Sequence, residues 1–428
     1  MGATITQKIL ARAAGRVSAE VGETIRCRPA NTIAYDFPGV TDSMFAQVAE
    51  LGIDQVVEPE RHVLFIDHFL PSLAPKVDRN PAQEDVHHNV TRAWAKKNGI
   101  KLHEGIGIGH QVCAELGYGL PGDFLIHFDG HVSQLGAQGA LALGVRRELI
   151  VAWVLGELWL EVPASQRFNL TGELSHGVLS RDLLHHIIGK IDADGCVDAV
   201  MEFAGTGAST ISLDGRAALC GMSMFTGAVS AIFNPDATSL AYARTRAKRE
   251  FEPLWSDPDA SYEAEHDFDL SEIEPQVVFP PSARNTRPIS EAEGTEVQQG
   301  YIGSCINGRL EDLRAAAEIL SGAKVKKGFR LLVVPSSRDI RERAEEEGLL
   351  DVIRRAGAEI HDPSCDFCNG FAAPMEAGES RISTGPLNVR GRMGSTEASI
   401  YMGSPYTVAA ASIEGRIVDP RSYLGRRT

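Results

Sequence analysis

Short apolar runs bounded by turn residues alternate along this chain with segments of helical spacing, and this alternation restricts the fold more than any other feature. The runs HVLFID (62–67), DFLIHFD (123–129) and FRLLVVPS (329–336) have the length and composition of buried strands. Segments 311–320 and 339–357 instead place apolar residues at helical intervals. We therefore predict an α/β protein.

The chain is long enough for several domains. With 428 residues, 43% of them hydrophobic, it can build two or three separate cores. Residues 250–288 are acidic and then proline-rich, a composition that favours an extended connection, so we predict the main domain boundary there. The Gly/Ala-rich stretch 135–145 follows a predicted strand and suits a helix packed tightly against a sheet.

Composition argues against several function classes. The most apolar region, 149–163, is interrupted by Glu157 and Glu161, and the N-terminus has no apolar run behind its charges, so we expect no membrane segment and a cytoplasmic protein. A net charge of -15 disfavours nonspecific nucleic-acid binding. Seven scattered cysteines do not resemble a secreted disulfide framework. Nucleotide binding has no motif support, because no glycine-rich phosphate loop occurs at a strand-to-helix junction.

Three cysteines form a candidate metal site. Cys365 and Cys368 lie in a loop rich in Asp, Asn, Pro and Gly, and Cys305 lies in a Gly/Ser/Asn loop just before a predicted helix. Thiolates suit zinc or an iron–sulfur cluster, and three of them fall one short of a closed four-thiolate site. A histidine could complete a zinc shell, whereas a cubane could leave one iron open. Spacing alone does not separate these possibilities from a chance pair beside an ordinary buried thiol.

Acidic and imidazole side chains follow predicted strands at three places. They are Asp67 with His68, His110 with Gln111, and Asp129 with His131. One such pair is usually structural, because carboxylates commonly orient imidazoles. Open α/β sheets, however, bind ligands at the carboxyl ends of their strands, and proton transfer needs groups that titrate near neutral pH. Three groups at equivalent positions therefore indicate an active site.

A series of motifs in one order covers nearly the whole chain. It comprises TITQKILARAAG, GIGIGHQVCAELGYGLPG, FDGHVSQLGAQGALALGV, GVLSRDLLHHIIGKIDADG, GSCINGRLEDL, CDFCNGF and GRMGSTEASIYMGSPYTVAAASIEGRIVDP. Together these motifs resemble the large subunits of 3-isopropylmalate dehydratases, within the aconitase superfamily. The resemblance implies an aconitase-like three-domain α/β/α architecture around an iron–sulfur site. Two intertwined domains would occupy residues 1–284 and carry the Asp/His motifs, and a third would occupy 285–428 and carry the cysteines.

The resemblance also implies a catalytic [4Fe–4S] cluster held by Cys305, Cys365 and Cys368. Its fourth iron, without a protein ligand, would bind a substrate hydroxyl and carboxylate as a Lewis acid. The catalytic residues implied are Asp67, His68, His110, Asp129 and His131, and the substrate-binding ones are Gln111, Asn388 and Arg392. The Asp-His pair at 67–68 would serve the leaving hydroxyl. The family's base is a serine on a swivelling fourth domain, which we expect this chain to lack, so a separate small subunit is implied.

The sequence departs from the family pattern where the family holds substrate and cluster-bound water. The departures are Gly130 and Val132 for a serine and a threonine, Gly221 and Phe225 for an asparagine and a glutamate, and Pro386 and Leu387 for an Asn-Arg pair. A guanidinium binds a carboxylate through two charge-assisted bonds, which an apolar side chain cannot offer. We therefore expect a substrate other than 3-isopropylmalate or citrate, with fewer carboxylates or with an apolar group in place of one. Alternatively, Arg390 or Arg392 swings in to replace the lost charge.

Two function classes follow from these observations. An iron–sulfur-dependent hydro-lyase, working as a dehydratase, hydratase or isomerase on a small 2-hydroxy acid, would use the thiols and the imidazoles together. Alternatively, the chain is a noncatalytic or regulatory member of the family in which the cluster, or a zinc ion, only stabilises the third domain.

Overall fold

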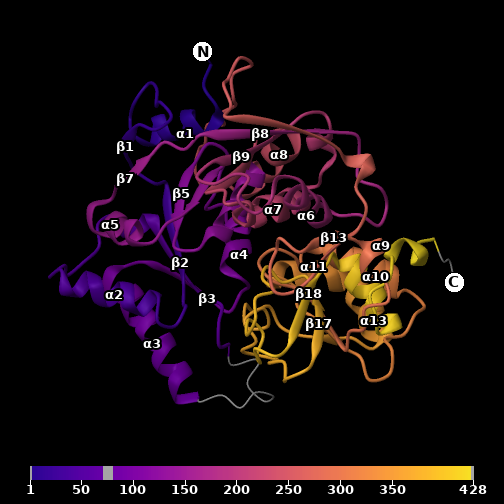
Figure 1. Cartoon of the computed structure of the whole chain (residues 1–428). Coiled ribbons are helices and arrows are strands. Elements are labelled where there is room, and N and C mark those ends of the chain that lie inside the picture. The colour runs from indigo at the N-terminus through magenta and orange to yellow at the C-terminus, as the bar shows by residue number, and fades with distance from the viewer. Residues whose placement is uncertain (1, 71–80, 426–428) are drawn as a thin grey trace.

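The structure, a computed structural model, describes residues 2–70 and 81–425, with 81–87 described by their backbone alone, and is built on three β-sheets with flanking helices (Figure 1). The N-terminal part, purple in Figure 1, contains the first sheet, and the orange and yellow C-terminal part contains the third. A two-stranded antiparallel ribbon of β1 (Thr24–Cys27) and β7 (Leu158–Glu161) lies beside the first sheet. The predicted α/β class is confirmed.

The first sheet is parallel throughout, with the strand order β4-β3-β2-β5-β6. Its strands are β2 (Asn31–Tyr35), β3 (His62–Ile66), β4 (Lys101–Glu104), β5 (Phe124–His127) and β6 (Leu141–Gly144). Its helices are α1 (Ile5–Ala13), α2 (Thr41–Glu50), α3 (Pro81–Asn98), α4 (Gly109–Glu115) and α5 (Arg147–Leu155). Strands β2, β3 and β5 are buried along their length, as in parallel sheets covered on both faces. The strand order reverses between β2 and β5, and open α/β sheets bind ligands at the carboxyl ends of their strands beside such a reversal.

The second sheet is also parallel, and its strand β10 packs against the segment that follows β5 of the first sheet. Its order is β10-β9-β8-β11, formed by β8 (Ser165–Thr171), β9 (Val200–Ala204), β10 (Ser230–Phe233) and β11 (Ala264–Asp269). Its helices are α6 (Ser180–Ile191), α7 (Leu213–Met222) and α8 (Ala237–Arg246). Gly136, in the 3₁₀ helix η3 (Gly130–Gln138), packs on β10 so closely that a Cβ there would lie 1.9 Å from the carbonyl oxygen of Ala231. Only glycine fits at this joint.

The third sheet is mixed, with the order β13-β12-β18-β17-β14-β15-β16. Its strands are β12 (Gln276–Val278), β13 (Thr286–Pro288), β14 (Gln299–Ile302), β15 (Arg330–Val333), β16 (Glu359–Ile360), β17 (Ser380–Ser383) and β18 (Ser399–Met402). Its helices are α9 (Ile289–Ala292), α10 (Leu310–Leu320), α11 (Arg338–Glu346), α12 (Leu349–Ala356) and α13 (Pro405–Glu414). Strands β14 to β18 are parallel, and their order reverses between β14 and β17. The loop after β14 carries Cys305.

Most predicted elements are confirmed, namely β3, β5, β15 and α10. The segment 339–357 forms two helices, α11 and α12, because Gly348 between them has a φ of 73°, outside the helical region. The stretch 135–145, expected to suit a helix packed tightly against a sheet, is helical only in its first part. The 3₁₀ helix η3 ends at Gly139, whose φ is 84°, and 141–144 form strand β6. The tight packing expected of this stretch is nevertheless present at Gly136.

The predicted connection 250–288 contributes strands to two sheets. β11 completes the second sheet, whereas β12 and β13 belong to the third. The division at 284/285 stays a prediction. Within residues 2–70 and 81–425, none of the helices combines the length and the apolar character that a membrane crossing needs.

Candidate active site

Three neighbouring strands of the first sheet end in ionisable side chains. Asp36 follows β2, Asp67 and His68 follow β3, and Asp129 follows β5. Because the strands are parallel, these residues share one edge of the sheet, and the reversal between β2 and β5 lies at its centre. His110 joins them from the first turn of α4, after β4. The predicted catalytic edge therefore gathers carboxylates and imidazoles.

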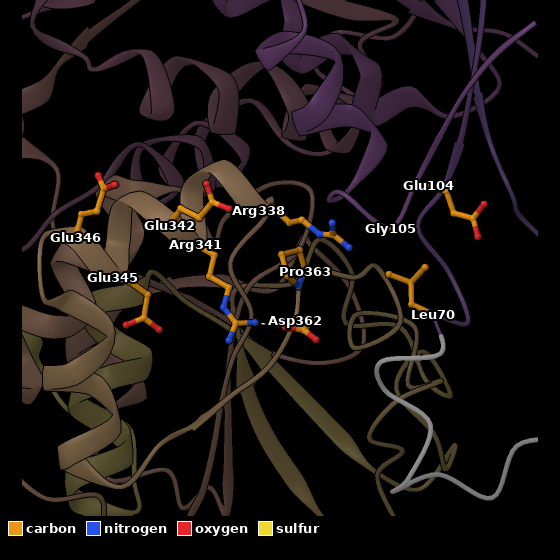
Figure 2. A pocket seen from close by; sticks show the side chains of 10 residues that line it. All are labelled: Leu70, Glu104, Gly105, Arg338, Arg341, Glu342, Glu345, Glu346, Asp362 and Pro363. Carbon is orange, nitrogen blue, oxygen red and sulfur yellow. Dashed lines mark hydrogen bonds and ion pairs between the residues drawn. The ribbon is translucent and has the colours of Figure 1, made fainter.

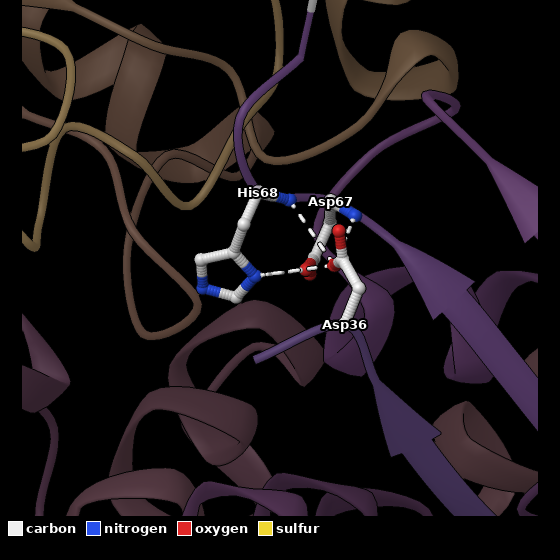
Figure 3. Close-up of side chains that lie close together, drawn as sticks. All are labelled: Asp36, Asp67 and His68. Atoms are coloured by element: carbon white, nitrogen blue, oxygen red, sulfur yellow. Dashed lines mark hydrogen bonds and ion pairs between the residues drawn. The ribbon is translucent and has the colours of Figure 1, made fainter. Parts of the chain in front are cut away.

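His68 is held between two carboxylates (Figure 3). Its Nδ1 lies 2.7 Å from Oδ1 of Asp67 and 3.3 Å from Oδ1 of Asp36, and all three side chains are buried. The backbone N–H of Asp67 donates to the same Asp36 oxygen at 2.9 Å, and that of Gly109 donates to Oδ2 of Asp67 at 2.8 Å. Nδ1 of His68 therefore carries a proton, and Nε2 points away from both carboxylates.

The carboxylates determine the charge of this imidazole. Burial alone would lower the pKa of His68, but the charges and hydrogen bonds of Asp67 and Asp36 raise it well above its ordinary value. His88 of α3 lies 3.3 Å from the second oxygen of Asp36 and donates to the carbonyl oxygen of His68 at 2.9 Å. The imidazolium form is stable at neutral pH, as a proton donor requires.

Asp36, Asp67 and His68 also have the spacing of a cation site, since one ligand atom of each lies within 4.8 Å of the others. The ring nitrogen that faces the carboxylates is Nδ1, and it carries the proton of both contacts. A metal ion would have to displace that proton from a buried group in which carboxylate and imidazolium already balance each other. The arrangement is that of an acid–base pair.

Asp129 is the centre of a second polar group. Its Oδ2 accepts a short hydrogen bond from the Tyr35 hydroxyl, and its Oδ1 accepts the backbone N–H of His131 at 2.7 Å. Nε2 of His110 lies 4.0 Å from Oδ1 and has no hydrogen-bond partner among the described residues. Burial would raise the pKa of Asp129, but His131, His110 and His127 hold it well below its usual range. Asp129 is therefore a carboxylate.

The imidazoles beside Asp129 can take different parts in proton transfer. Nδ1 of His131 donates to the carbonyl oxygen of Gly221 at 2.7 Å, which leaves Nε2 as its reactive nitrogen. Burial lowers the pKa of His110 to about 4, so this ring is neutral at pH 7. The site thus combines an imidazolium at 68 that can give a proton with a neutral imidazole at 110 whose Nε2 has no partner among the described residues.

The three predicted metal ligands come together from two loops of the third sheet. Cys305 lies between β14 and α10, and Cys365 and Cys368 follow β16. The sulfurs of Cys365 and Cys368 are 3.4 Å apart, and besides burial the Cys368 thiolate raises the pKa of Cys305. The backbone N–H of Cys365 donates to the carbonyl oxygen of Asp67 at 3.0 Å, which places these thiols beside the loop of His68.

A guanidinium group and a buried hydroxyl lie near the sulfurs. Arg392 lies with Nη2 3.8 Å from Sγ of Cys368. The hydrogen bond from Cys365, together with the charges of Arg392 and His68, lowers the pKa of Cys368. The buried hydroxyl of Tyr301 interacts electrostatically with the cysteines and has no hydrogen-bond partner among the described residues. Soft thiolates, a guanidinium and an unpaired donor suit an anionic iron–sulfur cluster, so these residues fit that group.

Arg309 ties the Cys305 loop to the first sheet. It is 2% exposed, and its Nε donates to Oε1 of Gln111 at 2.9 Å. Its Nη2 donates to Gln134 of η3 and, at 3.0 Å, to the carbonyl oxygen of Cys305. Gln111 is engaged at its other end as well, because Nε2 donates to Glu115 at 2.9 Å. Gln111 thus braces Arg309, and its contact with substrate stays a prediction.

Contacts within the protein occupy two other positions singled out in the sequence, Asn388 and Gly221. The amide of Asn388 donates to the carbonyl oxygen of Phe279 at 2.9 Å, so its substrate role likewise stays a prediction. At Gly221 a Cβ would lie 2.9 Å from Cδ1 of Ile306, the residue after Cys305. A side chain at 221 would therefore have to displace the end of the Ile306 side chain next to the thiol loop.

Apolar side chains line the site next to Asp129. A Cβ at Gly130 would lie 3.2 Å from Sδ of Met224, a side chain that is 40% exposed. The ring of Phe225 lies 5.9 Å from that of His131. Where the family has serine and glutamate, this chain therefore presents a thioether and a phenyl ring.

A cavity of about 910 Å³ lies near these loops (Figure 2). Leu70, two residues after His68, lines it together with the end of β4, and α11 contributes a charged wall that includes Arg338 and Arg341. None of the predicted site residues lines this cavity. This cavity is therefore separate from the group of predicted site residues.

Sequence reasoning missed several residues of the site, namely Tyr35, Asp36, His88, His127 and Arg309. Asp36 follows a short apolar run as Asp67 does, so the position after residues 31–35 carried a usable signal. Arg309 stands inside the motif GSCINGRLEDL. His88 and His127 carried none, because nothing in the local pattern of α3 or β5 distinguishes them from buried structural histidines.

Thiols, imidazoles and carboxylates gathered at the carboxyl ends of parallel strands are the arrangement expected of an α/β enzyme. The family model of aconitase (aconitate hydratase) matches residues 7–415. This chain belongs to the aconitase family and is an enzyme of the hydro-lyase type. The resemblance inferred from the motifs, and with it the aconitase-like fold, is confirmed.

Similar proteins cover the chain from end to end. The 3-isopropylmalate dehydratase large subunit 1 of Methanopyrus kandleri is 37% identical over 99% of this chain and 100% of its own length. The 3-isopropylmalate dehydratase large subunit of Heliobacterium modesticaldum is 39% identical over 98% of this chain and 99% of its own. The crystal structure of Thermococcus kodakaraensis aconitase X (holo-form) covers 84% of each chain, with a TM-score of 0.48 and 12% identity.

Proposed function

We propose that this chain is the large subunit of an iron–sulfur-dependent hydro-lyase that removes water from a small 2-hydroxy acid or adds water to the corresponding unsaturated acid. The observation that carries the proposal is the contact between the two loops: the N–H of Cys365 donates to the carbonyl oxygen of Asp67, beside the imidazolium of His68. Cys305, Cys365 and Cys368 would hold a [4Fe–4S] cluster, which when bound supplies a Lewis acid for the substrate hydroxyl.

The chain's own residues would handle the protons. His68 would give the proton that the leaving hydroxyl needs, from Nε2, while Asp67 and Asp36 keep the ring protonated. Asp129, oriented by the Tyr35 hydroxyl, would orient the neutral His110 beside the reacting atoms. These roles of the predicted site residues belong to the proposal.

A second chain would complete the site. The relatives from Methanopyrus kandleri and Heliobacterium modesticaldum are both named large subunits. We infer a small subunit that covers the thiols, excludes water, and supplies the base that removes the substrate's carbon-bound proton. The large subunit alone would then be nearly inactive.

The apolar wall points to a substrate other than 3-isopropylmalate or citrate. Met224 and Phe225 offer contact surface but no hydrogen bond or charge. Arg392 remains as the cation at the thiols, so one carboxylate of the substrate keeps a partner. The pocket therefore favours a hydroxy acid with an apolar group, or with one carboxylate fewer, at the Asp129 end.

Anaerobic purification with iron and sulfide analysis tests the cluster. We expect about four iron atoms and four sulfides per chain, as one cubane requires, and a spectroscopic change of the cluster on addition of substrate. A chain that contains zinc and no sulfide, or a full cluster that no hydroxy acid perturbs, would contradict the catalytic assignment and favour a structural site.

The complex with its small subunit tests the substrate. It should be assayed with 3-isopropylmalate, citrate, 2-methylmalate and less charged 2-hydroxy acids. Turnover of 3-isopropylmalate or citrate with a kcat/KM of about 10⁴ M⁻¹s⁻¹ or more, the ordinary range for enzymes, would disprove the altered substrate class.

A further inference from the structure

Asp366, the residue after Cys365, binds the loop that carries His68. Its side chain is 0% exposed. Its Oδ1 accepts the backbone N–H of Phe69 at 2.7 Å, and its Oδ2 accepts that of Leu70 at 3.4 Å. Hydrogen bonds to a buried carboxylate are stronger than those between neutral groups, so this side chain holds the backbone that follows His68 firmly.

Ser364 strengthens the same junction from the other side. Its hydroxyl donates to Oδ2 of Asp366 at 2.7 Å and lies 3.3 Å from the carbonyl oxygen of Asp67. That carbonyl oxygen also accepts the N–H of Cys365 at 3.0 Å. The backbone on both sides of His68 is therefore bonded to the cysteine loop.

Contacts at this junction hold Phe69 in an unfavourable backbone conformation. Its φ is 52°, in the left-handed region that side chains other than glycine seldom adopt. Such a conformation costs on the order of 1–3 kcal/mol and persists only where the surroundings impose it. Here the Asp366 carboxylate binds the N–H of Phe69, and the ring of Phe69 stacks on that of Phe371 with centroids 4.7 Å apart. The strain is thus offset by contacts with the cysteine loop.

We propose that Asp366 is a positioning residue that makes the placement of His68 depend on the state of the cysteine loop. Asp366 stands between Cys365 and Cys368, so a group bound by both thiols fixes the backbone from which its carboxylate projects. A loop without its cluster then also loses the alignment of His68. The link to the cluster rests on the proposed function, whereas the junction itself rests only on the contacts above.

Amide hydrogen exchange of the full chain, with and without the reconstituted cluster, tests this role. In D366A the amides of Phe69 and Leu70 should exchange at least about tenfold faster than in the wild type, because both lose their acceptor, while those of β3 stay unchanged. Reconstitution of the wild type should slow the same two amides. The matched control is D362N, which alters a half-exposed carboxylate of the same loop that pairs with Arg341, and it should change neither set.

The conservative variant D366N keeps an oxygen for the N–H of Phe69 and should recover most of the exchange protection. With its small subunit it should show a lowered kcat and a KM within about twofold of the wild type, because the loop that carries His68 is less well aligned. Should D366A not fold, D366N carries the test through faster exchange of the Leu70 amide, since the NH₂ group of asparagine cannot accept its N–H.

Three outcomes would overturn the proposal: wild-type exchange of these amides in D366A, acceleration that extends equally through β3, or identical exchange with and without a full cluster. A wild-type chain that takes up no iron would disprove the proposed function instead. The comparison of D366A with the wild type in the cluster-free chain would still decide the role of the junction.

Discussion

Nδ1 of His68 and Oδ1 of Asp67 lie 2.7 Å apart in a fully buried pair. This contact determines whether the stability of the fold rises or falls with pH. The pKa of His68 is raised in the fold, mainly by Asp67 acting against the effect of burial. Protonated His68 therefore stabilises the fold fully below its unfolded pKa of about 6.5, and this contribution is lost as the pH rises through the higher folded pKa.

Asp67→Asn should lower the pKa of His68, because the neutral amide removes the charge that stabilises the imidazolium. We expect the alkaline limit of kcat to move to lower pH and kcat to fall by about 10²–10⁴-fold, the range of general acid–base catalysis. Titration of the His68 ring by NMR measures the first effect without any substrate. An unchanged pKa of His68 in this variant would contradict the assignment of the pair.

Serine at Cys305, Cys365 or Cys368 should sharply reduce bound iron, because each substitution leaves two thiolate ligands. The control is serine at a remaining cysteine. The thiol of Cys27 donates to the carbonyl oxygen of Leu10 at 3.7 Å and that of Cys196 to Oε1 of Gln166 at 3.2 Å, so neither sulfur belongs to the three-cysteine group. Iron and sulfide analysis distinguishes the two groups. Full iron content in Cys365→Ser would disprove the ligand assignment.

Arg309→Gln should destabilise the chain by more than about 3 kcal/mol, because buried carbonyl oxygens of the Cys305 loop and of two glutamines lose their donor at a cost of about 1–3 kcal/mol each. Arg314→Gln is the matched control. Its partner Glu347 and its own side chain are 36% and 52% exposed, so this loss should stay below about 1 kcal/mol. Urea denaturation measures both, and equal losses would refute the bracing role of Arg309.

The sequence was informative where local pattern and chemistry coincide. Strand β3 could be read from its apolar run, and Asp67 with His68 from their place at its end. The sheet order that brings Asp36 beside them could not, since β2 and β3 are separated by α2 and pair only in the fold. The hydrogen bond between Arg309 and Gln111 joins residues far apart in the chain, and no local pattern records such a contact.

The glycines of the site differ in how closely an added Cβ would approach its neighbours. The loss of stability on substitution should follow the same order. At Gly136 a Cβ would meet the carbonyl oxygen of Ala231 at 1.9 Å, and backbone cannot move aside. At Gly221 it would meet the buried Cδ1 of Ile306 at 2.9 Å, so the Ile306 side chain has to repack. At Gly130 it would meet only the thioether of Met224, at 3.2 Å, and methionine adapts readily.

Gly136→Ala should therefore cost more than about 3 kcal/mol, Gly221→Ala about 1–3 kcal/mol, and Gly130→Ala less than about 1 kcal/mol, as expected for increasing freedom to repack. Denaturant midpoints of the three variants test the order.

Because Gly130 tolerates a side chain, Gly130→Ser should fold normally and return a hydroxyl beside Asp129, displacing Met224 from the wall. We expect its kcat/KM to rise for hydroxy acids with an additional carboxylate relative to apolar ones, with Gly130→Ala as the control that moves Met224 without adding a hydrogen-bonding group. If Gly130→Ser and Gly130→Ala show the same preference as the wild type, Met224 does not shape the substrate pocket.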